Sequence, residues 1–383
     1  MSNLSYMEKL LDGVEVEWSI LGDENFVEIA NSGRKPVKSS LRVPGNIPYY
    51  GANNIQDYVD GYTHDGEYVL VAEDGSASLE RYSIQYTTDR FWANNHVHVV
   101  RGKLGLNTRY LYHYLSTVNF IPFLTGGVRA KLTKGNMIEI PIPIPCPDNP
   151  KKSLSIQAEI VRILDTFTEL TAELTAELVA RKQQYTYYRE QLLTFEEDKV
   201  EWIELGNLAE NLDSKRKPIT SGLRESGDIP YYGASGIVDY VKDYIFDGDY
   251  LLVSEDGANL IARNTPIAFS ISGKNWVNNH AHVLKFETYA ERRYIEYYLN
   301  SIDLTPYISG AAQPKLNQKN LNSIKVPNPT FKEKERIVAI LDKFEALTTS
   351  LTEGLPLEIA LRQQQYEYYR ELLLSFPKLE GEA

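Results

Sequence analysis

The chain has 383 residues, of which 43% are hydrophobic and 24% charged, and this is ordinary for a globular protein of two or three domains. Its net charge of −12 argues against a general nucleic-acid coat, and −7 of that charge falls in two segments, 153–200 and 332–383. The single cysteine excludes an internal disulfide, and the absence of a signal peptide or a membrane-length apolar run leads us to expect a cytoplasmic protein with no membrane partner.

The sequence repeats itself at a spacing of 182 to 184 residues. The stretch IPYYGANNIQDYV from Ile47 returns as IPYYGASGIVDYV from Ile229, and NNHVHV from Asn94 returns as NNHAHV from Asn278. A repeat of this length outweighs any local pattern in deciding the architecture. We therefore expect two copies of one module, each followed by a helical segment.

Residues 1–13 form the first segment. Tyr6 and Glu8 match Tyr188 and Glu190 near the end of the first helical segment, so this stretch resembles the tail of a helical repeat. We expect an N-terminal helix that completes the helical region and packs beside the end of the second helix. The termini would then lie close together, in a cyclic arrangement with a pseudo-two-fold axis.

The two modules span 14–152 and 198–331. Runs such as EYVLVAEDG and HVHVV predict short strands separated by turns, and RYLYHYL predicts one helix, so each module is β-rich with mixed α+β structure. The run IPIPIP from Ile140 has a proline at every second position. Because proline cannot donate to a sheet ladder, we expect an extended edge or strap that leads into the next helix.

Long helices are predicted over 153–197 and 332–376, ahead of a tail at 377–383. Apolar residues spaced by threes and fours form a narrow stripe typical of a coiled-coil seam, and the helix of the other copy is its expected partner. Gly354 and Pro356 predict a kink or short break in the second helix. The residues assigned to this seam or to subunit contact are Ile160, Phe167, Leu174, Tyr185, Tyr188, Ile337, Phe344, Leu351, Tyr366 and Tyr369.

No constellation of residues predicts catalysis. The sequence has no nucleotide-binding P-loop, no nucleophile elbow, no HExxH motif and no cysteine cluster. His96 and His98, with His280 and His282, are the best candidates for a metal site or a general base, but a structural or DNA-contacting role is favoured because no third ligand is evident. Glu73 and its neighbour Asp74 are interpreted as a turn that ends a strand.

The positive signals are for binding. Basic residues recur just ahead of the IPYYGA stretch in both copies, and Lys and Arg on loops can anchor phosphates while Arg, Asn, Gln and Tyr can reach base edges. A constant frame whose contact residues differ suits two modules that bind different sequences. The candidate DNA-binding residues are Arg34, Lys35, Lys38, Tyr50, Asn95, His96, Arg129, Lys131, Arg216, Lys217, Tyr232, Asn279, His280, Gln313 and Lys315.

Taken together, these motifs resemble the specificity subunit of type I restriction-modification systems. The resemblance rests on the repeated IPYYGA and DYV, the NNHxHV run, the GxxxKL loop, and ILDxF followed by RxQQYxYYRExLL after each module. It implies two target recognition domains joined by helices in an antiparallel coiled coil, with no chemistry in this chain. It also implies a split target in double-stranded DNA, two modification subunits and restriction subunits as partners, and S-adenosylmethionine, ATP and magnesium on those partners.

Two other classes of protein stay open at this point. A stand-alone nuclease or methyltransferase would need a cofactor loop and an Asn/Asp-Pro-Pro-aromatic motif, and the sequence has neither. A tyrosine-rich scaffold or carbohydrate-binding protein would share the aromatic composition and would not bind DNA.

Overall fold

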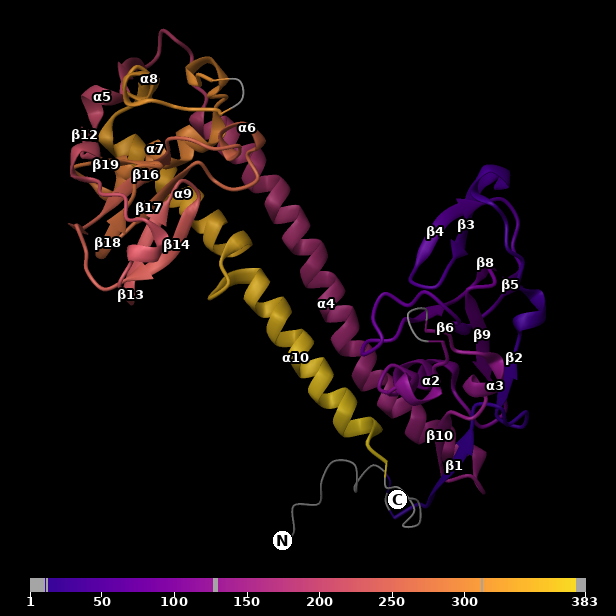
Figure 1. Cartoon of the computed structure of the whole chain (residues 1–383). Coiled ribbons are helices and arrows are strands. Elements are labelled where there is room, and N and C mark those ends of the chain that lie inside the picture. The colour runs from indigo at the N-terminus through magenta and orange to yellow at the C-terminus, as the bar shows by residue number, and fades with distance from the viewer. Residues whose placement is uncertain (1–10, 12, 127–129, 311–312, 377–383) are drawn as a thin grey trace. The chain divides into compact units, whose positions relative to one another are not determined.

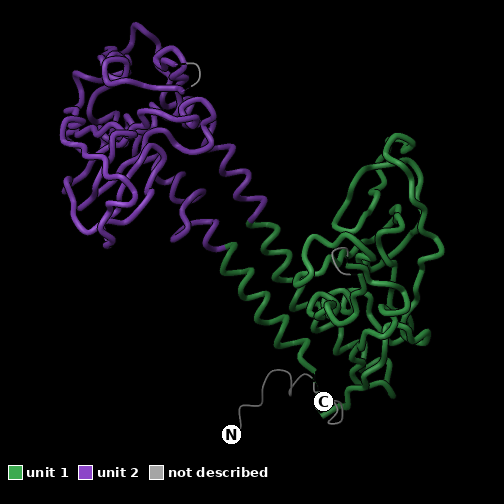
Figure 2. The backbone as a smooth tube through the Cα atoms, in the orientation of Figure 1, with its two compact units in different colours: residues 1–174, 359–383 green, residues 175–358 purple. Residues whose placement is uncertain are grey.

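The computed structural model describes residues 11, 13–126, 130–310 and 313–376. The chain divides into two compact units, the first built from residues 1–174 and 359–383 and the second from residues 175–358 (Figure 2). Each unit therefore combines one module with parts of both helical segments. The sequence-based division treats those helices as separate segments.

The first unit contains ten strands among the described residues. They form a four-stranded sheet in the order β4-β3-β8-β5, a second in the order β2-β9-β6-β7, and the pair β1-β10. Within the first sheet β3 and β8 are parallel, and the other pairs in the unit are antiparallel. The strands are β1 (Val16–Ile20), β2 (Val27–Ile29), β3 (Pro44–Tyr50), β4 (Ile55–Val59), β5 (His64–Asp65), β6 (Tyr68–Ala72), β7 (Ile84–Thr87), β8 (Arg90–Ala93), β9 (Val97–Gly102) and β10 (Pro141–Pro145).

The second unit repeats this topology strand for strand. Its sheets have the orders β14-β13-β18-β15, β12-β19-β16-β17 and β11-β20. The strands are β11 (Glu201–Glu204), β12 (Glu210–Asn211), β13 (Ser226–Gly233), β14 (Gly236–Val241), β15 (Phe246–Asp247), β16 (Tyr250–Ser254), β17 (Ala268–Ile271), β18 (Lys274–Val277), β19 (Ala281–Lys285) and β20 (Lys325–Asn328).

The two long helical segments and the RYLYHYL helix lie where the sequence predicts them, with several short additions (Figure 1). The predicted N-terminal helix of residues 1–13, with its expected packing beside the second helix, lies outside the described residues except for Leu11 and Gly13. The α-helices are α2 (Thr108–Leu115), α3 (Lys134–Met137), α4 (Pro150–Leu193), α5 (Leu205–Leu208), α6 (Asn259–Ala262), α7 (Tyr289–Ser301), α8 (Gln318–Asn322), α9 (Phe331–Thr349) and α10 (Gly354–Leu374). Short 3-10 helices span Asn31–Gly33, Ser39–Leu41, Ile121–Phe123, Asp213–Lys215, Ser221–Leu223 and Thr305–Tyr307.

The proline-alternating run is the edge strand that the sequence predicts. Strand β10 pairs with β1, and the amide of Cys146 donates to Glu15 O while Leu21 N donates to Ile140 O. The even-numbered residues therefore bond to β1, and the prolines occupy positions whose missing N–H faces away from it. Ile142 and Ile144 between them are buried in the core of the first unit.

The second helical segment is interrupted between Thr349 and Gly354. Gly354 has φ +76°, and a Cβ built there would lie 2.4 Å from Ala346 O, so the chain folds back tightly against the end of α9. Pro356 lies in the first turn of α10, where its missing N–H has no helical partner to lose. The assignment of Leu351 to the coiled-coil seam is wrong, because the interruption leaves its side chain 81% exposed.

Each unit pairs α4 with a part of the second helical segment. In the first unit α10 runs beside α4 in the opposite direction (Figure 1). Phe167 of α4 stacks on Tyr369 of α10, with ring centroids 5.2 Å apart. In the second unit Phe344 of α9 lies against Tyr185 and Tyr188 at 6.1 and 5.6 Å. The α+β fold class with paired antiparallel helices is therefore confirmed.

The seam residues are apolar contacts of uneven burial. Ile160 and Ile337 are fully buried in the cores of their units, whereas Leu174 and Tyr366 are half-buried. Leu11 belongs to the same core as Leu373 and Leu374 of α10. Leu10, with the rest of residues 1–10, lies outside the described residues.

Candidate nucleic-acid interface

The loop of residues 34–43, which joins the 3-10 helix Asn31–Gly33 to β3 and contains the 3-10 helix Ser39–Leu41, is held in one shape by contacts along its length. Arg34 Nη1 donates to Glu73 Oε2 at 2.6 Å and to Val97 O at 2.8 Å, which fixes the start of the loop. Arg42 Nε donates to Val37 O at 3.1 Å and closes the other end. The loop therefore has a fixed conformation, which is maintained by its contacts with the sheets.

Two aromatic side chains support the middle of the loop. The amide of Val37 donates to the hydroxyl of Tyr49 at 3.0 Å, and Trp92 Nε1 donates to Lys35 O at 2.7 Å. The guanidinium of Arg42 lies 4.1 Å from the ring centroid of Tyr49. A cation on an aromatic face adds to the fixation of the loop.

The second unit builds the same loop from matched residues. Arg216 donates to Glu255 at 2.6 Å, Ile219 N to the Tyr231 hydroxyl at 2.9 Å, and Trp276 Nε1 to Lys217 O at 2.6 Å. The lengths of the matched hydrogen bonds in the two units thus agree to within a few tenths of an ångström. Sequence analysis placed basic residues here in both copies but missed the supporting residues Arg42, Arg224, Tyr49, Tyr231, Trp92 and Trp276, whose recurrence at offsets of 182 and 184 was the available signal.

Glu73 and Glu255 are the hubs of these frames. Lys131 Nζ lies 2.9 Å from Glu73 Oε1, and Lys315 Nζ lies 3.0 Å from Glu255 Oε1, so each carboxylate holds an arginine and a lysine from separate loops. Burial opposes ionisation of Glu73, but the hydrogen bonds from Arg34 and Lys131 outweigh it and lower its pKa. Arg34 and Lys131 therefore share one carboxylate at Glu73, and Arg216 and Lys315 share Glu255, so all four basic side chains are engaged within the protein.

The histidines of the two NNHxHV runs have different surroundings at each position. His96 precedes β9, is exposed, and lies 2.5 Å from Asp74, whereas His98 is buried inside the strand. His280 matches His96, with its Nδ1 2.9 Å from Asp256. The two histidines of one run therefore do not converge on one ligand, as a shared metal site would require.

The two buried histidines differ in their partners. His98 Nε2 donates to Leu132 O, and its Nδ1 accepts from the amide of Asn31 at 2.9 Å, which fits a neutral imidazole. Burial lowers the pKa of His98, in agreement with that state. In the second unit Asp213 replaces Asn31, and both nitrogens of His282 face oxygen acceptors, at Asp213 (2.5 Å) and Leu316 O (2.7 Å).

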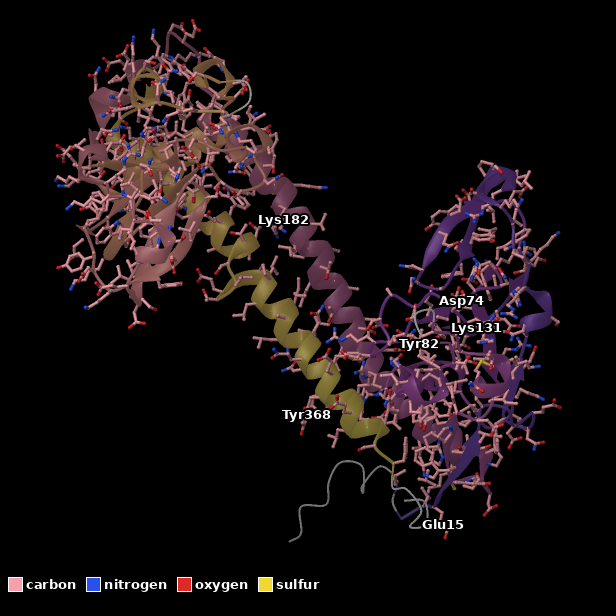
Figure 3. All side chains as sticks on the ribbon, viewed as in Figure 1. Glu15, Asp74, Tyr82, Lys131, Lys182 and Tyr368 are labelled. Carbon is pink, nitrogen blue, oxygen red and sulfur yellow. The ribbon has the colours of Figure 1, made fainter. Side chains whose placement is uncertain are left out.

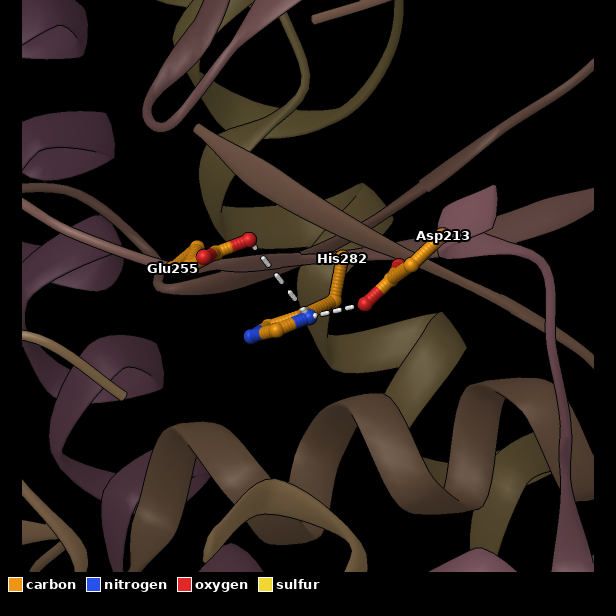
Figure 4. A group of neighbouring side chains, drawn as sticks. All are labelled: Asp213, Glu255 and His282. Atoms are coloured by element: carbon orange, nitrogen blue, oxygen red, sulfur yellow. Dashed lines mark hydrogen bonds and ion pairs between the residues drawn. The ribbon is translucent and has the colours of Figure 1, made fainter. Parts of the chain in front are cut away.

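Asp213, Glu255 and His282 are close enough together to be tested as a metal site (Figure 4). Their candidate ligand atoms lie within 4.8 Å of one another. However, Arg216 and Lys315 already bind the carboxylates, and His282 has no nitrogen left to offer a metal. These residues therefore fit a buried ion network and do not fit a cation.

The remaining candidate DNA-binding residues fall into two groups. Tyr50 packs edge-on against Phe91 in a core, and Tyr232 is half-buried against Phe269. Arg129 lies outside the described residues. Exposed side chains available for contact are Lys35, Lys38, Asn95, Lys217, Asn279 and Gln313.

Comparison with known proteins gives a consistent result. The family model for the type I restriction modification DNA specificity domain matches twice, over residues 15–181 and 197–361. The chain belongs to this family. A putative type I restriction enzyme specificity subunit of Haemophilus influenzae is 49% identical over 98% of this chain and 99% of that protein. A type I restriction enzyme specificity subunit of Escherichia coli is 36% identical over 99% of each chain.

Solved structures of type I specificity subunits share the fold. The S subunit of a type I restriction-modification system from M. genitalium matches with a TM-score of 0.61 and 16% identity, over 96% of this chain and 98% of that one. This likeness shows the shared fold, and the family match with its relatives confirms the interpretation of the sequence as a specificity subunit. Among the described residues of this specificity subunit, no helix is both long and apolar enough to cross a membrane.

An exposed cation–aromatic pair also recurs in the specificity subunit and was missed from sequence. Arg90 lies 4.8 Å from the ring centroid of Tyr62, and Lys274 lies 4.6 Å from that of Tyr244. Both tyrosines are nearly half exposed, so these pairs lie on the surface of each unit. Such pairs can offer a cation and an aromatic edge to a ligand at once.

Proposed function

We propose that this specificity subunit binds double-stranded DNA at a split site, with one half-site bound by each unit and the gap between them set by the joining helices. The observation that carries the proposal is the duplicated loop, residues 34–43 and 216–225, held rigidly by matched contacts. A preformed basic loop loses little conformational entropy when it binds. Two such loops on one chain suit two half-sites.

The two loops have closely similar sequences. This similarity suits contact with the sugar-phosphate backbone, which is the same at every DNA sequence. RKPVKSSLR from Arg34 matches RKPITSGLR from Arg216, so Lys35 and Lys217 recur while Lys38 becomes Thr220. Constant basic residues are suited to phosphate contacts, which position a protein on the duplex without specifying sequence. We therefore assign these loops to the DNA backbone.

The turn that follows β3 differs between the copies and is suited to base recognition. Residues 53–56 are NNIQ in the first unit, and residues 235–238 are SGIV in the second. Asn and Gln can bond to base edges, whereas Val offers an apolar contact to a thymine methyl group. Arg129 and Gln313, which also differ, belong to the same proposed set, whereas Asn95 and Asn279 are identical in the two copies and belong with the constant loops.

Assembly with the other subunits completes the proposed role. A specificity subunit has no chemistry of its own, so two modification subunits would dock on the helices and methylate adenine with S-adenosylmethionine, and restriction subunits would supply ATP- and magnesium-dependent cleavage. The modification subunit would flip its target base out of the duplex. The cytoplasm, where bacterial DNA is accessible, is the proposed compartment. Family membership does not favour the scaffold or carbohydrate-binding alternative.

The proposed function is tested by measuring DNA binding at the site that the system methylates. Methylome sequencing of cells with and without the gene defines the split motif, and gel shifts of the assembled complex then use that duplex and duplexes with the gap changed by one or two base pairs. We expect binding only at the native gap, because the distance between half-sites is fixed by protein. Equal binding at every gap would contradict the proposal.

Charge variants test the assignment of the loops. Lys35→Ala and Lys217→Ala should each weaken binding at all sequences and reduce the salt dependence, with a slope loss of about 0.9 per phosphate contact. Lys103→Ala is the matched control, since Lys103 is an exposed lysine of the first unit outside the loop. A loss of specificity with unchanged salt dependence would assign these lysines to bases instead.

A further inference from the structure

A pocket recurs at the same place in both units, where a module meets the long helices. In the first unit a pocket of about 550 Å³ lies between the end of α2, the segment at Arg81 and the α10 residues Glu367, Arg370 and Glu371. In the second unit a pocket of about 440 Å³ lies between α7, the segment at Arg263 and the α4 residue Arg189. The repeat aligns Arg370 with Arg189 and Arg81 with Arg263.

The matched arginines Arg189 and Arg370 each have a buried side-chain donor, the Nε atom, without a hydrogen-bond acceptor. Each guanidinium lies over a tyrosine ring of its own helix. Arg189 is 5.5 Å from the ring centroid of Tyr185, and Arg370 is 5.4 Å from that of Tyr366. No ion pair joins either arginine to a carboxylate of the described chain. A buried donor without an acceptor is rare in folded proteins, and its recurrence in both units indicates a shared purpose.

The acidic residues that line the pockets do not fill this requirement. In the second unit Glu296 and Glu345 both bind Arg293, with Glu296 Oε1 at 2.6 Å. In the first unit Glu367 lies 3.9 Å from Arg81. Arg263 is likewise occupied, because it donates to the carbonyls of Leu299 and Ile302. The described part of the chain therefore supplies no acceptor to the Nε atoms of Arg189 and Arg370, which leaves an acceptor from outside the chain.

Exposed aromatic rings lie on the same helices. Tyr187 is 59% exposed and packs edge-on against Tyr188, which itself stacks on Phe344. Tyr368, labelled in Figure 3, is 63% exposed and packs in the same way against Tyr369. Tyrosine and arginine together are the residues that most often dominate protein–protein interfaces.

We propose that each pocket receives one acidic side chain of a modification subunit, bound by Arg189 in the second unit and by Arg370 in the first. The proposal rests on the proposed function, since it names a contact between this chain and the subunit expected on its helices. Two equivalent pockets, one in each unit, suit two copies of one partner. The charge of one carboxylate matches that of one guanidinium, and an arginine can bind a carboxylate through two parallel N–H donors.

The test uses the full-length chain and the purified modification subunit of the same system. Arg189→Ala and Arg370→Ala should each reduce the affinity for one partner copy at least tenfold, so that native mass spectrometry shows complexes with one modification subunit in place of two. The double variant should lose both. Arg189→Lys, which keeps the charge and loses the Nε donor, should give an intermediate result.

Controls separate this proposal from a folding effect and from the proposed function. Arg181→Ala removes an exposed arginine of the same helix that is already paired with Glu177, and it should assemble normally. Unchanged melting of Arg189→Lys excludes misfolding as the cause. Normal assembly of Arg189→Ala and Arg370→Ala would overturn the proposed pocket contacts while leaving DNA recognition intact. Failure of the unaltered chain to bind any modification subunit would instead overturn the proposed function.

Discussion

At the scale of single residues, the basic side chains of each unit divide into those that bind Glu73 or Glu255 and those that lie outside these ion networks. Arg34 and Lys131 have charge and position suited to DNA, but both bind the carboxylate of Glu73, although the side chain of Lys131 is 46% exposed. Sequence composition could not separate them from Lys35 and Lys38, because the separation depends on which loops the fold brings to Glu73. The recurrence of both types shows that the frame and the contact surface were duplicated together.

Removing the charge of the hub should loosen the loop in one unit at a time. Glu73→Gln leaves Arg34 and Lys131 without their carboxylate and should cost about 1–3 kcal/mol. Glu255→Gln should cost less, because Asp213 still lies 3.3 Å from Arg216. Hydrogen exchange at the amides of residues 37 and 219, which bond to Tyr49 and Tyr231, measures the two effects separately. Equal acceleration in both units would contradict this account.

The neutral state of His98 makes the first unit sensitive to acid. Because burial lowers its folded pKa below the unfolded value of about 6.5, its contribution to stability is complete above that pH and is lost as the pH falls below it. Asn31→Asp places a carboxylate beside Nδ1, as Asp213 does for His282, and should raise the pKa of His98. Melting at pH 7.5 and 5.5 should then show a smaller acid loss in the variant. His64 and His113 titrate in both proteins, so the difference isolates His98.

At the scale of elements, strands and helices followed from the sequence wherever a short pattern was sufficient. The alternating prolines of β10, the runs that became β6 and β9, and helix α2 each carry their signal within a few residues. The division of the chain into units could not be predicted in this way. Helix α4 has one continuous apolar stripe, and no residue pattern marks the position where it passes from one unit to the next. The prediction for Leu351 was wrong for a related reason. Its spacing continues the apolar stripe, but helix α9 ends at Thr349.

The interruption between α9 and α10 depends on Gly354. Gly354→Ala would force a side chain into a positive-φ conformation and against the carbonyl of Ala346, so it should destabilise the second unit by about 1–2 kcal/mol. Gly222→Ala is the matched control, since a Cβ there meets nothing within 4 Å. Denaturant unfolding of both variants checks the difference. If the two glycines proved equally tolerant, the interruption would not depend on the left-handed residue.

At the scale of the whole molecule, two copies of one frame that differ in a few exposed residues should be exchangeable in function. The frame contacts around Glu73 and Glu255 match, so residues placed on one frame should keep their geometry on the other. Specificity would then be a property of short segments and would be independent for each half-site. Independent sites far apart are expected to contribute additively to binding.

Grafting the turn of the second unit onto the first tests this independence. Replacing residues 53–56, NNIQ, by SGIV should change the bases recognised in one half-site and leave the other half-site and the gap unchanged. Asn53 bonds to Gly75 O and to the amide of Ala77, so the graft removes a local support of the turn, and melting must show that the unit stays folded. Replacing residues 37–40, VKSS, by ITSG is the control, because it should keep the methylated motif and weaken binding by about one phosphate contact. Methylome sequencing reports both outcomes, and a graft that altered both half-sites would show that the units do not recognise DNA separately.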